Sequence, residues 1–151
     1  MADPAAHDDA VVLERELDAP VELVWRMWID PDDFAAWYGP DGATVQVEEM
    51  DVRVGGTRRV RMEVAGPEGP MQMGFVGEHV EIDEPRRLVY SESMAGPDGS
   101  VSPPHTRVVV ELEDLGGRTR LVLTHHGVPA DSPGATGWAM ALEALGARLP
   151  G

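Results

Sequence analysis

The sequence predicts an α+β domain in which a curved antiparallel sheet wraps around a long C-terminal helix. Residues 136–149 carry one apolar helical stripe, whose members Trp138, Leu142, Leu145 and Leu149 lie within about 60° of one another. Between residues 43 and 126, apolar and polar residues alternate in segments that end at glycine or proline, as strands do. Consecutive strands joined by short turns pair antiparallel, so their apolar face gives the helix a surface to pack against.

Two short helices are expected between the first strand and the rest of the sheet. Residues 11–17 form the first strand, and Asp18 is placed to cap the helix that follows it. The second helix starts at Asp30, an N-cap residue followed by proline and two acidic residues that suit the positive end of a helix. The apolar residues of the two helices are Val21, Val24, Trp25, Trp28, Phe34 and Trp37.

Six more strands are expected before the closing helix, at residues 43–54, 57–64, 71–82, 87–94, 106–115 and 118–126. In residues 57–64 the alternation places Val60, Met62 and Val64 on one face and Arg59, Arg61 and Glu63 on the other. Gly77 is expected to mark a bulge, so the register of the second half of 71–82 stays open. Residues 95–104, rich in glycine, proline and serine, predict a loop.

The length and the net charge of the chain limit the possible functions. A chain of 151 residues fits one domain, expected at residues 11–149 after a disordered acidic stretch at 1–10, and can bury roughly 70 % of its unfolded surface. The net charge of −15 argues against nucleic acid and anionic membranes as partners. The sequence shows no apolar run of membrane-spanning length and no signal peptide, so we expect a cytoplasmic protein without membrane insertion. With no cysteine, a thiol nucleophile and disulfides are excluded.

Several motifs occur in a characteristic order along the chain. They are Leu17–Trp25, Trp37 with Gly39-Pro40, Asp51–Gly56, Glu81–Val89, and Gly137-Trp138 followed by Leu142 and Leu145. Together they resemble the SRPBCC superfamily, and within it the bacterial group named after the activator of the heat-shock ATPase chaperone. The resemblance covers residues 11–149. It implies the helix-grip fold, similar to the birch pollen allergen and the START domains, with a cavity between the sheet and the C-terminal helix.

The resemblance leaves several functions open. The superfamily includes passive carriers of lipids or hormones, aromatases and cyclases of polyketide biosynthesis, and oxygenase domains with iron, and a shared fold does not choose among them. The eukaryotic co-chaperone has a separate N-terminal chaperone-binding domain, for which this chain is too short. Our leading hypothesis is the binding of a small apolar or aromatic molecule. The alternatives are a cyclase- or hydrolase-like reaction on such a molecule and a chaperone-linked stress regulator; a homodimer is a further open alternative.

Aromatic and methionine residues are the candidates for the apolar wall of a binding site. The competing interpretation, and the commoner one for any single side chain of this kind, is that it fills the core. Methionine adapts to irregular shapes, so several methionines on inward strand faces lean toward a pocket for a variable guest. The candidates are Trp28, Trp37, Met62, Met73, Phe75, Met94, Trp138 and Leu142.

Three polar residues could act on a bound molecule. His125 shares strand parity with Leu121 and Leu123, and Glu92 shares it with Tyr90, so we expect Tyr90, Glu92 and His125 to face the interior. Such a set could orient a ligand or transfer protons. The competing interpretation is that the histidine and the glutamate lie at strand ends and reach water.

No metal or cofactor is expected. His125 and its neighbour His126 point to opposite faces of a strand, and His7, His79 and His105 do not have ligand spacing. No glycine-rich phosphate loop precedes a helix. We therefore expect a site made of side chains alone.

Overall fold

A computed structural model describes residues 10–39, 42–96 and 100–149, without the side chains of 102–104. The elements follow the predicted order of strand, two helices, six strands and helix. They are β1 (Ala10–Leu17), α2 (Val21–Ile29), α3 (Pro31–Trp37), β2 (Thr44–Met50), β3 (Thr57–Gly66), β4 (Gly69–Asp83), β5 (Arg87–Ala95), β6 (Val101–Asp114), β7 (Thr119–His126) and α4 (Pro133–Arg148). The expected disordered stretch at 1–10 lies outside the described residues, except for Ala10, which begins β1.

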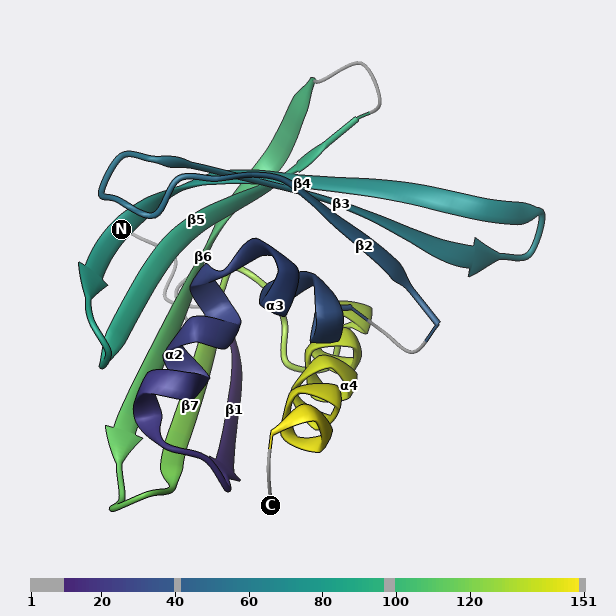
Figure 1. Ribbon diagram of the computed structural model, residues 1–151. Helices are drawn as coiled ribbons and strands as arrows, with labels where there is room; N and C mark the ends of the chain where they lie inside the picture. Colours follow the sequence, from purple (N-terminus) through teal and green to yellow (C-terminus); the bar gives the residue numbers. More distant parts are fainter. Residues whose placement is uncertain (1–9, 40–41, 97–99, 150–151) are drawn as a thin grey trace, which may run out of the picture.

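The seven strands form one antiparallel sheet in the order β1-β7-β6-β5-β4-β3-β2. The first strand of the chain pairs with the last, so β1 and β2 lie at opposite edges although only two short helices separate them in sequence. The sheet curves, and α2, α3 and α4 lie on its concave side (Figure 1). This arrangement confirms the predicted α+β helix-grip fold.

The hydrophobic core lies between the concave face of the sheet and the three helices. From the sheet, Leu121 and Leu123 contribute side chains that are fully buried. From α4, the predicted stripe contributes Trp138, Leu142 and Leu145, all buried. An amphipathic helix is stabilised mainly by burying such a stripe, so α4 depends on the sheet for its own stability.

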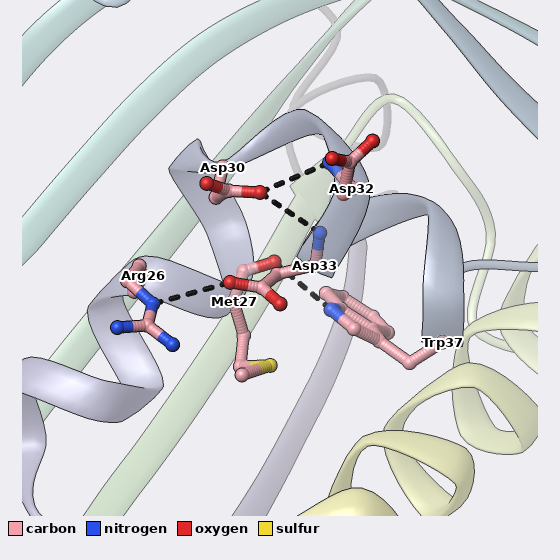
Figure 2. A network of polar contacts seen from close by, with 6 residues as sticks. All are labelled: Arg26, Met27, Asp30, Asp32, Asp33 and Trp37. Atoms are coloured by element: carbon pink, nitrogen blue, oxygen red, sulfur yellow. Dashed lines mark hydrogen bonds and ion pairs between the residues drawn. The ribbon is translucent and has the colours of Figure 1, made fainter.

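The corner between α2 and α3 is held by polar contacts that the sequence predicts in part (Figure 2). The side chain of Asp30 accepts hydrogen bonds from the backbone nitrogens of Asp32 and Asp33, each at 3.0 Å, and so caps α3 as expected. The indole nitrogen of Trp37 donates to the backbone oxygen of Met27 at 2.9 Å. This bond joins the end of α3 to α2 and fixes Trp37 in the core.

Three predicted boundaries are wrong. Asp18 does not cap α2, because Pro20 occupies the N-cap position without a side-chain hydrogen bond. The strand expected at 43–54 ends at Met50, where a turn leads to Gly55 with a φ of 85°. The loop expected at 95–104 is shorter, because β6 already begins at Val101. In β6, pairing with β5 extends the strand despite its polar, proline-containing sequence.

The predicted bulge in β4 exists, but at a different residue. The pairing of β3 with β4 is regular through Gly77, and the register of β4 against β5 shifts only between His79 and Glu81. Gly77 has another role, since a Cβ atom there would collide with the carbonyl oxygen of Ser91 on β5. Glycine is therefore required because the two backbones approach closely.

Candidate functional site

The concave face of the β3–β4 hairpin carries a row of side chains that runs from the core to the surface. We call this set the inner row. It comprises Arg58, Val60, Met62 and Val64 of β3 and Phe75, Met73 and Met71 of β4, with Gly77 opposite Arg58. Arg58 and Met62 are buried, Met73 and Phe75 are half-buried, and Met71 is 50 % exposed. The row therefore offers an apolar surface that the helices cover only at one end.

Met94 extends the inner row onto β5. It pairs directly with Phe75, and residues directly opposite each other in an antiparallel pair project to the same face. Its side chain is 47 % exposed. The predicted wall residues Met62, Met73, Phe75 and Met94 thus lie on one continuous surface.

Aromatic rings fill the space where the inner row meets the helices. The ring centroids of Trp28 and Trp138 are 5.9 Å apart, and Tyr38 lies 5.5 Å from Trp138 and 6.4 Å from Phe75. Trp37 packs edge-on against Trp28 at 4.7 Å. Trp28 and Trp37 are buried core residues, whereas Tyr38 is half-buried beside the inner row. The roles of these rings, and of the buried Leu142, as ligand contacts stay predictions.

Two hollows lie on the surface of the sheet. One, of about 100 Å³, lies at the β3–β4 hairpin, where Arg59, Arg61 and Gln72 line it together with Val60, Met73 and Phe75 of the inner row. The other, of about 460 Å³, is lined in part by Arg107, Val109 and His126. Neither is the expected cavity between the sheet and α4, where the rings described above pack together.

Glu92 faces the interior from β5, as the strand parity predicts. Its side chain is only 14 % exposed, and burial raises the pKa of its carboxyl group to about 7. The positive charge of Arg58 and a hydrogen bond with the hydroxyl of Tyr38 act in the opposite direction. Burial also raises the pKa of Tyr38, and the charge of Glu92 raises it further. Glu92 can therefore gain or lose a proton near neutral pH.

His125 also faces the interior, where its two ring nitrogens are occupied. Nδ1 accepts a hydrogen bond from the indole nitrogen of Trp138 at 2.9 Å, so the neutral ring carries its proton on Nε2. Nε2 then donates to the hydroxyl of Thr106 at 2.7 Å, and that hydroxyl donates to the backbone oxygen of Glu92 at 2.9 Å. Burial, together with the charge of His126, lowers the pKa of His125 to about 4. His125 is thus neutral near pH 7.

The geometry separates the roles of His125 and Glu92. Nε2 of His125 lies 3.8 Å from Oε1 of Glu92, which is too long for a hydrogen bond. Because its nitrogens bond to Trp138 and Thr106, the histidine positions α4 against β6 and β7. Glu92 and Tyr38 are the pair left to act on a bound molecule.

Arg58 is, like Tyr38, a site residue that the sequence did not predict. It is 3 % exposed, and its guanidinium lies between the rings of Tyr90 and Phe34, with Cζ 4.0 and 4.7 Å from their centroids. Nη1 donates to the backbone oxygen of Trp28 and contacts Nε2 of His79, both at 3.3 Å. The signal was present in the sequence, because Arg58 shares strand parity with Val60 and Met62.

The described residues contain no helix long and apolar enough to cross a membrane. Within the same part of the chain, no group of three or more histidine, aspartate and glutamate side chains could hold a metal ion.

One family model and several solved structures match this chain. The model of the family described as activator of Hsp90 ATPase homolog 1-like protein matches residues 18–149. A protein from Chromobacterium violaceum is similar in structure, with a TM-score of 0.79 and 26 % identity over 95 % of this chain and 99 % of its own. One from Mycobacterium smegmatis gives a TM-score of 0.82 and 23 % identity over 99 % and 94 %.

A third solved structure carries the family designation in its own description. It is an AHSA1 protein from Silicibacter pomeroyi, with a TM-score of 0.77 and 23 % identity over 92 % of this chain and 96 % of that one. A search of curated proteins found no match. The family model covers most of the sequence, and the chain therefore belongs to the family of activator of Hsp90 ATPase homolog 1-like proteins.

Proposed function

We propose that this protein binds a small apolar or aromatic molecule on the inner row, beside Tyr38 and Trp138. The observation that carries the proposal is the partly uncovered apolar surface of Met71, Met73 and Met94. Contiguous apolar surface that a fold leaves uncovered marks interaction sites more often than chance, and methionine suits guests of variable shape. The members of the superfamily that carry lipids or hormones give the proposal a precedent.

The polar residues next to the inner row fit such a guest. Binding sites for small molecules are mostly apolar and have a few polar groups that fix the orientation of the ligand. Here Tyr38 and Glu92 supply a hydroxyl and a carboxyl group at the buried end of the apolar surface. A guest would lie along the methionines and direct its polar group toward this pair.

Thermal unfolding with a panel of neutral probes that includes naphthalene-2-carboxamide tests the proposal. A probe held only by the folded protein raises the melting temperature by mass action, and we expect saturable shifts for part of the panel. Met73→Gln should weaken the binding of those probes about fivefold, because about 1 kcal/mol of apolar contact is lost from a half-buried side chain.

The matched control is Val12→Gln on β1, at the opposite edge of the sheet, where Val12 is 61 % exposed. We expect this variant to bind the probes as the wild type does. Equal losses in both variants, or a panel in which no probe shifts the melting temperature, would remove the inner row as a binding surface.

A reaction on the bound molecule is the second candidate, favoured by the raised pKa of Glu92. A carboxyl group with a pKa of about 7 can donate or accept a proton near neutral pH, and Tyr38 is in hydrogen-bond contact with it. Hydrolysis of 2-naphthyl acetate should then fall in Glu92→Gln by a larger factor than the affinity for the neutral carboxamide does. Equal hydrolysis by the variant and the wild type would leave binding alone as the function.

A further inference from the structure

The buried guanidinium of Arg58 has no negatively charged partner at contact distance. No described carboxylate forms an ion pair with it, although a guanidinium remains charged in proteins and is costly to bury unpaired. Two contacts offset part of this cost. Nη1 donates to the backbone oxygen of Trp28 in the last turn of α2, where the helix dipole is negative, and the rings of Phe34 and Tyr90 face the cation.

Buried polar atoms around Arg58 also lack a hydrogen bond of ordinary geometry. They are Nη2 of Arg58 itself, the hydroxyl of Tyr90, the indole nitrogen of Trp28 and Nδ1 of His79. The guanidinium of Arg58 is close enough to the hydroxyl of Tyr90 to oppose the rise in its pKa. The guanidinium and indole nitrogens are donors only, and a tyrosine hydroxyl can donate as well. Since buried polar groups nearly always have a partner, this part of the interior is short of an acceptor.

We infer that the molecule bound by this protein carries a carboxylate-type oxyanion, which accepts hydrogen bonds from Arg58 and Tyr90. The inference rests on the proposed function, because the inner row would hold the apolar body of the same molecule. A planar carboxylate matches the fork of donors on a guanidinium, and charge-assisted bonds of this kind are the strongest available to a neutral tyrosine and a cation.

The spacing of side chains along β3 sets the length of this molecule. Arg58 is at the buried end of the inner row, and Met62 follows four residues later on the same face. At about 3.3 Å per residue, the two positions are roughly 13 Å apart. The molecule class is therefore an acid with an apolar body of that length, such as an aromatic or medium-chain aliphatic carboxylic acid.

The other titratable groups around Arg58 can all be neutral, so they do not repel an anion that binds there. His79 is neutral near pH 7, because burial and the charge of Arg58 lower its pKa. Burial raises the pKa of both Tyr90 and Tyr38, so both hydroxyls stay protonated. The charge of Glu92 is coupled to Arg58, and protonation of Glu92 removes a negative charge that would compete with a guest.

A matched pair of probes tests the inference. Naphthalene-2-carboxylate and naphthalene-2-carboxamide differ in charge and hardly in size. Isothermal titration at pH 6, where Glu92 is mostly protonated and the carboxylate probe is ionised, gives both affinities. We expect the carboxylate to bind at least about tenfold more tightly to the wild type. Arg58→Met and Tyr90→Phe should each reduce this preference. Tyr90→Phe should change the melting temperature of the free protein little, because the hydroxyl makes no hydrogen bond of ordinary geometry in the fold.

Two further variants separate an anion site from a structural role of Arg58. Arg61→Met removes an exposed arginine of the same strand and should keep the preference for the carboxylate. At pH 8, where Glu92 is ionised, Glu92→Gln removes the competing charge and should raise the affinity for the carboxylate relative to that for the carboxamide. Carboxylate and carboxamide binding with equal affinity would overturn the inference and leave the proposed function intact. If neither these two probes nor any member of the neutral panel binds, the proposed function fails and the inference fails with it.

Discussion

Replacement of Glu92 by glutamine should stabilise the protein at alkaline pH and leave its stability unchanged in acid. Glutamine is the neutral counterpart of the protonated glutamic acid, so the variant isolates the cost of ionising this buried group. The pKa of Glu92 is about 7 in the fold and near its ordinary value of 4.5 in an unfolded chain. The folded state therefore binds more protons than the unfolded state between these values, and Glu92 destabilises the fold progressively as the pH rises from 4.5 through 7.

The magnitude follows from the same two values. A difference between about 7 and 4.5 corresponds to about 3 kcal/mol at most, reached above pH 7. Urea unfolding of both proteins at pH 4 and pH 8 measures it. Glu92→Gln should match the wild type within about 0.5 kcal/mol at pH 4 and exceed it by up to about 3 kcal/mol at pH 8. Glu49→Gln, an exposed substitution on β2, should match the wild type at both.

The opposite sign at pH 8 would refute the reasoning. If Glu92→Gln were the less stable protein there, the attraction between Glu92 and Arg58 would outweigh the cost of burial, and the pair would act as a stabilising ion pair. The carboxylate of Glu92 would then be the partner that Arg58 otherwise lacks.

Three other predictions concern the packing of the fold. His125 has a folded pKa of about 4, so it contributes stability that is present above pH 6.5 and is lost as the pH falls through 4. In His125→Asn the free energy of unfolding should therefore fall less between pH 6.5 and pH 4 than it does in the wild type. Urea melts across this range check it. Trp138→Ala should lower the free energy of unfolding by about 3–5 kcal/mol in urea melts. Met140 is 38 % exposed on the same helix, and Met140→Ala should lower it by less than about 1 kcal/mol. Equal losses would show that α4 does not pack through Trp138. Asp30→Ala should cost about 1 kcal/mol through the lost cap of α3, measured in the same way, and an unchanged urea midpoint would contradict the cap.

Local patterns predicted most of the fold. Strand parity placed Glu92 and His125 on the inner face, and the helical stripe placed Trp138 and Leu142 in the core. These predictions succeeded because a strand or helix with one buried face shows its period directly in the sequence. The N-cap at Asp30 was visible for the same reason, since all the atoms involved lie within three residues.

The site depends on contacts that no local pattern contains. Arg58 lies at a strand position that faces the core, but arginine is usually a surface residue. It is buried because rings from α3 and β5 enclose its guanidinium. The bonds of His125 to Trp138 and Thr106 join three elements, so the sequence could not show that both ring nitrogens are occupied. The register shift after His79 likewise depends on how β4 pairs with β5.

Methyl NMR of the methionines tests the proposed binding surface most directly. With isotope-labelled methionine methyl groups and a saturating naphthalene probe, the account predicts that the signals of Met62, Met73 and Met94 shift together. The signals of Met27 in α2 and Met140 on α4 should not shift, because neither residue belongs to the inner row. Binding of the probe without a shift of the Met73 and Met94 signals would contradict binding on the inner row. Shifts confined to residues of the hollow that Val109 and His126 line would contradict it as well.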